Sequence, residues 1–85
     1  MRIETSGGKE YAARAAAAAR MRGESRLMIE MDVSMAEAAQ AMDGLEWIKV
    51  HQDSADGAYT MYEGYDRISG LTRTENGIRV TLARS

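Results

Sequence analysis

Apolar and polar residues alternate along several stretches of the chain, and each stretch predicts a strand with one face turned toward a core. The clearest lies at residues 26–33, where apolar residues alternate with mostly charged ones: Leu27, Ile29, Met31 and Val33. Further strands are expected at residues 1–5, 45–51 and 58–65. The runs 71–74 and 78–82 flank Glu75-Asn76-Gly77, in which the pair Asn-Gly predicts a β-hairpin.

Two stretches predict helices. Residues 9–22 are rich in alanine, which has the highest helix propensity, and they are followed by Gly23, a residue common just past a helix end. In such a helix, four small residues share a face that could lie close on a sheet: Ala12, Ala15, Ala16 and Ala19. The second helix is expected to begin at Ser34, which can form a capping box with Glu37. Its apolar face would contain Met35, Ala38, Ala39 and Met42.

The predicted order is strand, helix, strand, helix and then three or four strands. We therefore expect an α+β fold, in which a small mixed, mostly antiparallel sheet of four to six strands carries two helices on one face, one of them alanine-rich. The strands joined by helices can pair in parallel, whereas the last strands should pair antiparallel. The 85 residues suit a single domain, 1–85, with one modest core.

The composition excludes several classes of protein. The chain has no cysteine, so neither disulfides nor thiolate-bound zinc can stabilise it, and it is compatible with a reducing cytoplasm. No stretch approaches the roughly 18 apolar residues of a membrane span, and the first residues lack the apolar core of a signal peptide. We expect a soluble cytoplasmic protein that does not bind a membrane.

Charge is distributed in three blocks along the sequence. Residues 1–29 hold six basic and three acidic side chains, residues 30–66 hold nine acidic and one basic, and residues 67–85 hold four basic and one acidic. The acidic block could form a surface that attracts a basic partner. Alternatively, its acids could neutralise the two arginine-rich ends within the fold. A third interpretation uses the basic C-terminal hairpin, whose arginines could follow a phosphate backbone: Arg67, Arg73, Arg79 and Arg84.

Candidate chemistry is sparse. His51 is the single histidine, and Asp53 and Ser54 lie near it in sequence, but triad residues normally come from separate elements, so we expect a surface histidine. The stretch 6–9 is glycine-rich and precedes the alanine-rich stretch, but it lacks the Walker spacing and is expected to be a helix cap. Asp53 and Asp56 lack the further ligands of a calcium loop. We expect no enzyme activity, cofactor or metal.

The aromatic residues offer a better clue to function. Alternation would place Tyr59 and Tyr62 on opposite faces of a regular strand, and we expect Trp47 in the core and Tyr62 and Tyr65 at the surface. With the charge blocks, this indicates a protein that binds and occludes a macromolecule by an acidic, tyrosine-bearing surface. Its expected partner-binding residues are Asp53, Asp56, Tyr62, Glu63, Tyr65 and Asp66.

The expected partner is a protein with a basic surface, such as a nucleic-acid-binding complex. Small chains without cysteine or chemistry are common among phage and mobile-element accessory proteins, including inhibitors of host defence of the anti-CRISPR kind, and this class is our hypothesis. A homodimer is compatible with it. The alternative is a nucleic-acid-binding or antitoxin-like regulator that uses the arginine-rich hairpin, although the net charge of −2 opposes this.

Overall fold

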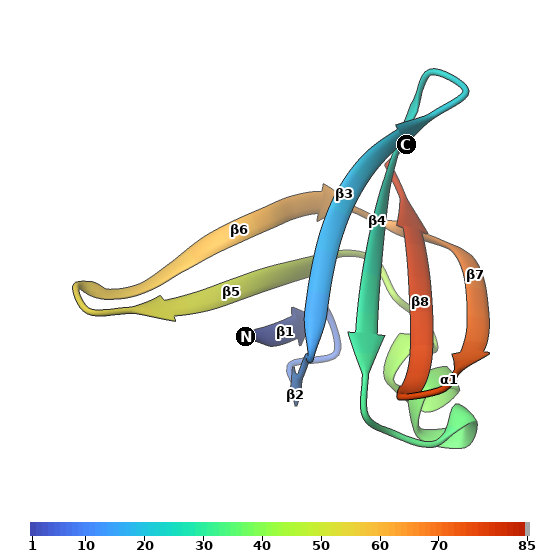
Figure 1. Ribbon diagram of the computed structural model, residues 1–85, viewed down its shortest axis with the longest axis horizontal. Coiled ribbons are helices and arrows are strands. Elements are labelled where there is room, and N and C mark those ends of the chain that lie inside the picture. Colours follow the sequence, from blue (N-terminus) through green and yellow to red (C-terminus); the bar gives the residue numbers. More distant parts are fainter. Residues whose placement is uncertain (85) are drawn as a thin grey trace.

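The computed structural model describes residues 1–84, which form two four-stranded antiparallel sheets and one short helix (Figure 1). Sheet A has the strand order β2-β1-β5-β6, and sheet B has the order β3-β4-β8-β7. The elements are β1 (Arg2–Thr5), β2 (Glu10–Ala12), β3 (Ala15–Met21), β4 (Glu24–Met31), α1 (Met35–Met42), β5 (Ile48–Ser54), β6 (Gly57–Tyr65), β7 (Arg67–Thr74) and β8 (Gly77–Ala83).

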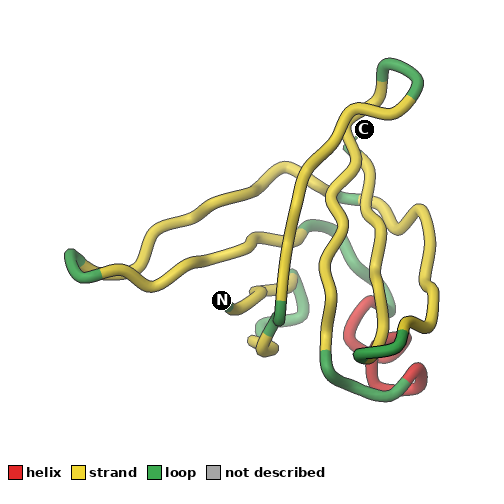
Figure 2. Tube along the Cα trace, viewed as in Figure 1, coloured by secondary structure: helices red, strands yellow, loops and turns green. Residues whose placement is uncertain are grey.

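The expected α+β fold is wrong. Figure 2 shows that strands dominate the described chain and that a single helix lies at one end of the molecule. There is no mixed sheet with two helices on one face, because every strand pairing in both sheets is antiparallel. The main cause of the error is the alanine-rich stretch, which is not a helix.

The alanine-rich stretch forms β2 and β3 instead, and residues 13–14 make a corner between them. All of β3 pairs in register with β4, from Ala15 opposite Glu30 to Met21 opposite Glu24. The strongly alternating β4 needs a hydrogen-bonded neighbour on each side, and this non-local pairing outweighs the helix propensity of alanine. An alanine helix would also offer the core only methyl groups.

Gly23 has a different role from the expected helix end. Arg22 and Gly23 have φ angles of 55° and 80°, and they form the two-residue loop between β3 and β4. Two successive residues with positive φ are characteristic of a type I′ turn, whose twist matches that of the paired strands. A glycine with positive φ is required by either structure, so this residue alone did not distinguish a helix end from a hairpin.

Several local predictions are confirmed. The Ser34 hydroxyl accepts a hydrogen bond from the Glu37 amide at 3.1 Å and so caps α1. The helix buries Ala38, Ala41 and Met42, whereas the predicted Ala39 is exposed. The hairpin between residues 71–74 and 78–82 is present, but its two turn residues are Glu75 and Asn76, Gly77 is the first residue of β8, and β7 already begins at Arg67. The strands predicted at residues 1–5, 26–33 and 58–65 correspond to β1, β4 and β6.

The core lies between the two sheets and is closed at one end by α1. Its fully buried members come from both sheets and alternate along their strands: Ile3, Leu27, Ile29, Met31, Ile48, Val50, Tyr65, Ile78, Val80 and Leu82. The chain passes between sheets at two sharp corners, residues 13–14 and Asp66, and through α1. At the first corner, the Ala13 amide still bonds to Met1 of sheet A, while the Arg14 amide bonds to Glu30 of sheet B. Strands that change sheets in this way join the two layers.

Within residues 1–84, no helix has the length and apolar character needed to cross a membrane.

Candidate partner-binding surface

The β5–β6 hairpin extends away from the body of the molecule and ends at the left of Figure 1. All eight residues from Asp53 to Thr60 are exposed. We call residues 52–60 the acidic arm, because it contains Asp53 and Asp56 and no lysine or arginine. The next basic side chains along the sequence, other than His51, are Lys49 and Arg67. The arm is therefore the most accessible part of the acidic block.

Local hydrogen bonds define the tip of the arm. Ser54 and Gly57 are the last cross-strand pair, so the turn contains only Ala55 and Asp56, whereas the strands predicted at residues 45–51 and 58–65 left residues 52–57 for the turn. The Ser54 hydroxyl donates to the Gly57 carbonyl at 2.6 Å, and Gly57 has a φ of 111° that favours glycine. Asp56 thus lies in a tight turn and not in a long flexible loop.

The three tyrosines of β6 lie on one face of the hairpin, contrary to the prediction for a regular strand. Tyr59 pairs with Gln52, Tyr62 with Val50 and Tyr65 with Ile48, and these partners alternate along β5. Two register shifts near Val50 insert extra residues into β6 and restore all three tyrosines to the same side. Their exposure rises along the hairpin: Tyr65 is 1% exposed, Tyr62 is half-buried and Tyr59 is 52% exposed.

Tyr65 is a core residue, so its expected place at the surface is wrong. Its hydroxyl lies 2.7 Å from that of Ser25 on β4, and the Arg84 guanidinium lies over its ring, 4.5 Å from the centroid. Trp47 is half-buried, not enclosed in the core, and Lys49 lies over its ring at 5.1 Å. The exposed aromatic residue of the arm is Tyr59, which the sequence-based site omitted because β6 was treated as regular.

The acidic residues of the expected site divide into two groups. Asp53 and Asp56 are exposed near the tip, together with Tyr59. Glu63 is exposed near the other end of β6, and Asp66 is half-buried at the corner that leads to β7. The fold therefore brings together two of the expected carboxylates with one tyrosine, and places the others at the base of the hairpin.

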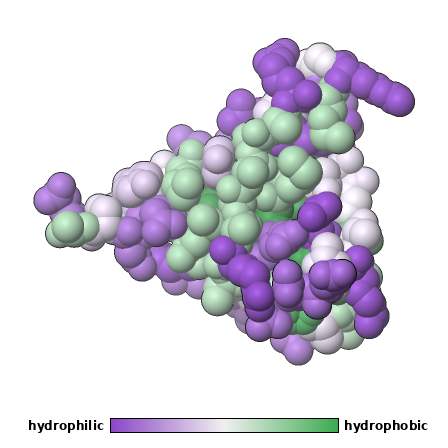
Figure 3. All heavy atoms as spheres, in the orientation of Figure 1, coloured by the Kyte–Doolittle hydropathy of each residue, from purple (hydrophilic) through white to green (hydrophobic). Residues whose placement is uncertain are grey.

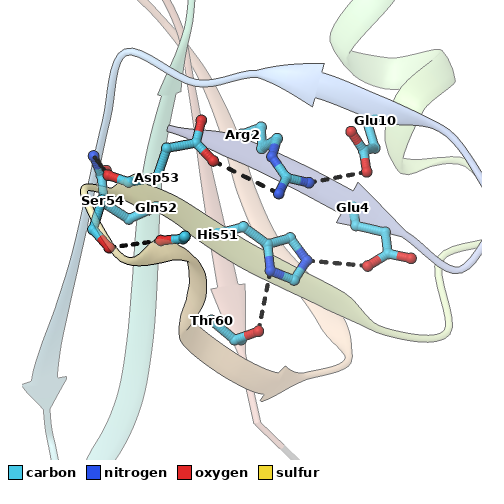
Figure 4. A network of polar contacts seen from close by, with 9 residues as sticks. Arg2, Glu4, Glu10, His51, Gln52, Asp53, Ser54 and Thr60 are labelled. Carbon is cyan, nitrogen blue, oxygen red and sulfur yellow. Dashed lines mark hydrogen bonds and ion pairs between the residues drawn. The ribbon is translucent and has the colours of Figure 1, made fainter.

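A row of polar side chains crosses the opposite face of the hairpin (Figure 4). His51 is directly opposite Arg2 on one side and Thr60 on the other. Its Nε2 atom lies 3.0 Å from a Glu4 carboxylate oxygen, and its Nδ1 atom lies 3.1 Å from the Thr60 hydroxyl. Arg2 lies 3.1 Å from Glu10 and 3.8 Å from Asp53. These contacts link β2, β1, β5 and β6.

The sequence placed His51 at a strand end on the surface, but it lies within β5 and its side chain is only 15% exposed. Its hydrogen-bond partners are not its sequence neighbours Asp53 and Ser54, in agreement with the rejection of a triad on sequence proximity, and Ser54 instead bonds within the turn. The contacts run from a carboxylate (Glu4) to a histidine (His51) to a hydroxyl group (Thr60), which is the order of groups in a catalytic triad. The three residues are, however, neighbours on adjacent strands on the outer face of a sheet. Cross-strand polar contacts of this kind stabilise strand pairing.

The charge blocks partly neutralise one another within the fold. Glu30 lies 2.9 Å from Arg79, and Asp32 lies 2.9 Å from Arg14, so acids of the central block pair with both arginine-rich ends. Of the C-terminal arginines, Arg84 stacks on Tyr65 and donates to the Glu63 carbonyl, and Arg67 donates to the Arg84 carbonyl. At the tip of the arm, Asp53 lies 3.8 Å from Arg2 but remains 73% exposed, and Asp56 is exposed in the turn.

The glycine-rich residues 6–9 form the turn between β1 and β2, and not a helix cap, since no helix follows them. Together with the end of α1, they line a cavity of about 210 Å³ that also contains Asp43 and Tyr11. The Ser6 hydroxyl accepts a hydrogen bond from the Glu46 amide at 2.8 Å and holds this turn against the segment before β5. Among the described residues, no three or more His, Asp or Glu side chains are placed to hold a metal ion.

Comparison with known proteins found no match to a protein-family model, to a curated protein sequence or to a solved structure.

Proposed function

We propose that the protein binds and occludes a macromolecular partner through the acidic arm, and that it acts without catalysis. The observation that carries this proposal is the projection of a continuous exposed segment, Asp53 to Thr60, from a small packed body. A two-stranded hairpin is stiffer than a loop of the same length, so it loses less conformational freedom on binding. An element of this shape can enter a groove that a flat sheet could not reach.

The chemistry of the arm favours a basic partner. Asp56 lies in the turn at the tip, and Asp53 is 73% exposed although it lies 3.8 Å from Arg2, so their field would speed encounter with a positively charged groove. Tyr59, which is 52% exposed, supplies apolar area and a hydroxyl group, as residues at interface hot spots commonly do. We therefore propose a binding site formed by Asp53, Asp56 and Tyr59. Tyr65 is excluded by its burial, and Tyr62, Glu63 and Asp66 lie toward the base.

A positively charged groove of this kind is a common feature of nucleic-acid-binding proteins, and an acidic hairpin inserted into it would block access to the nucleic acid. Inhibitors of host defence encoded by phages and mobile elements are the class of protein that this mode of action fits. We propose that the chain works in the cytoplasm, where such partners are found.

The alternative role in nucleic-acid binding has less support. It needs the arginines of the C-terminal hairpin to be free to contact phosphates. Arg79 is instead 2.9 Å from Glu30, and Arg84 is stacked on Tyr65. Binding to a short DNA or RNA duplex that falls steeply with salt would favour this alternative over the acidic arm.

The proposal is tested by affinity capture with the intact chain, followed by mass spectrometry. The arm variant carries Asp53→Lys, Asp56→Lys and Tyr59→Ala. The matched control carries Asp43→Lys and Glu75→Lys, which make the same change in charge at exposed positions outside the arm. We expect proteins retained by the wild type and by the control to be lost from the arm variant. Equal retention by all three chains would refute a role for the arm.

A further inference from the structure

β3 forms one edge of sheet B and, within residues 1–84, pairs only with β4. Sheet edges present unpaired amide and carbonyl groups that can join another strand, and proteins usually protect them. The other three edges of the two sheets are interrupted or short. β2 has three residues, and register shifts break β6 and β7. β3 has seven residues in unbroken register and contains neither proline nor lysine.

The pairing with β4 determines which groups of β3 face outward. Met21 and Glu24 close a two-residue loop, so they form a hydrogen-bonded pair. Hydrogen-bonded and non-bonded pairs alternate along antiparallel strands, so every second residue before Met21 bonds to β4. The residues between them direct their amide and carbonyl groups to the open edge: Ala16, Ala18 and Arg20.

The surroundings of this edge are apolar. Ala15, Ala16 and Ala17 line a shallow cavity of about 280 Å³ together with Met28, Glu30 and Arg79. Figure 3 shows hydrophobic residues gathered across the middle of the molecule, where β3 crosses the front in Figure 1. Met21, at the end of β3, is 50% exposed. An added strand would therefore cover apolar surface as well as satisfy the open edge.

We infer that the β3 edge binds the β3 edge of a second copy of this chain, in an antiparallel arrangement around a two-fold axis. Two edges made of alanine are self-complementary, because methyl groups meet methyl groups in either chain direction. No other strand edge of the described residues has this property. The pairing would join the two copies of sheet B into one continuous sheet.

The outward-facing backbone groups select the register of this pairing. An axis at Ala17 would place Arg20 opposite Arg14 of the second copy, whose amide already bonds to the Glu30 carbonyl. An axis at Ala18 places the two Ala18 residues opposite each other and sets Arg20 against Ala16 of the second copy. This register uses all the outward-facing groups of Ala16, Ala18 and Arg20, so the structure favours it.

A single strand pair is smaller than a stable interface of at least about 1,200 Å². We therefore expect a weak dimer with a Kd on the order of micromolar or above. Sedimentation equilibrium of the intact chain should show a concentration-dependent increase from monomer to dimer mass. Ala18→Pro removes an outward amide and no bond to β4, and proline is tolerated at such edge positions. This variant should remain monomeric with its circular dichroism unchanged.

A second measurement does not depend on the proline variant. Because the chain has no cysteine, single cysteines report on proximity without background. Residues directly opposite in a hydrogen-bonded pair have Cα atoms about 5.5 Å apart, a distance that a disulfide can span. Ala18→Cys should form a disulfide-linked dimer under mild oxidation, whereas the exposed helix residue changed in Ala39→Cys should form much less.

Three results would overturn the inference: a wild type that is monomeric at millimolar concentration, an Ala18→Pro variant that dimerises as the wild type does, or equal cross-linking at positions 18 and 39. The inference does not rest on the proposed function. Asp53→Lys and Asp56→Lys lie outside β3 and should leave the dimer unchanged, so the two proposals can fail separately.

Discussion

The hydroxyl groups of Tyr65 and Ser25 lie 2.7 Å apart, and they join β6 of sheet A to β4 of sheet B. Tyr65 is 1% exposed and lies at the base of the hairpin that carries the acidic arm. The hydrogen bond satisfies a polar group that would otherwise be buried without a partner. It therefore helps to fix where the arm leaves the body of the protein.

Tyr65→Phe should lower the free energy of unfolding by about 1–2 kcal/mol, because it leaves the partly buried Ser25 hydroxyl without its partner. Ser25→Ala should have a cost of similar size. The double variant should cost less than the sum of the two, since the residues share one interaction. Chemical denaturation of the four chains measures these values, and strict additivity would show that the hydrogen bond does not contribute.

Gly77→Ala should be among the most destabilising single changes in the chain. Gly77 has a φ of 139°, and a Cβ atom there would lie 2.2 Å from the Met31 carbonyl oxygen. Because that oxygen belongs to the backbone of β4, it cannot move without disturbing the strand. We expect a loss of about 3 kcal/mol or more. Gly7→Ala, whose added Cβ would meet its nearest atom at 3.6 Å, is the control and should be nearly neutral.

Arg22→Asn should stabilise the protein. Arg22 has a φ of 55° in the β3–β4 turn, a conformation that asparagine adopts at lower cost than arginine. The expected gain is about 0.5–1 kcal/mol, which thermal unfolding would detect as an increase in Tm of several degrees. Arg22→Val should have the opposite effect, because β-branched residues disfavour positive φ. A decrease in Tm for Arg22→Asn would contradict the assigned turn.

His51→Ala should destabilise sheet A by about 1–3 kcal/mol, because it removes hydrogen bonds to both Glu4 and Thr60. Thr60→Val should cost less, since it removes one of the two. If the row of polar groups is structural, both variants should lower Tm in that order and still capture the partners that the wild type captures. Loss of a chemical activity in His51→Ala without a change in Tm would instead show a catalytic role.

The sequence correctly predicted those elements for which local propensity and long-range packing favour the same secondary structure. The alternation of Leu27, Ile29 and Met31 placed β4 correctly, and Ser34 marked the start of α1. The alanine-rich stretch failed because its local preference for a helix conflicts with pairing to β4, and pairing depends on residues far away in sequence. Gly23 could not resolve the conflict, since both structures need a positive φ there.

Only part of the candidate site was predicted correctly, because the rest also depends on strand pairing. Asp53 and Asp56 are exposed, as their polar turn indicated. The positions of the tyrosines depend on two register shifts in β6, which a strict alternation of residues does not predict. The glycine at position 64, with a φ of 86°, was the available signal, because glycine within a strand often marks a bulge. A bulge at this glycine places Tyr65 on the same face of β6 as Tyr62, as the structure does.

Photo-cross-linking from the arm tests the proposed function most directly. A benzophenone side chain placed at position 59 would report on whatever contacts the exposed tip, and the same group at Ala39 on α1 provides the control. In an extract of the native host, position 59 should give a discrete protein adduct that excess wild-type chain suppresses and that position 39 does not give. The adduct should disappear when Asp53→Lys and Asp56→Lys are added. The absence of a specific adduct at position 59, when position 39 gives one, would contradict the account.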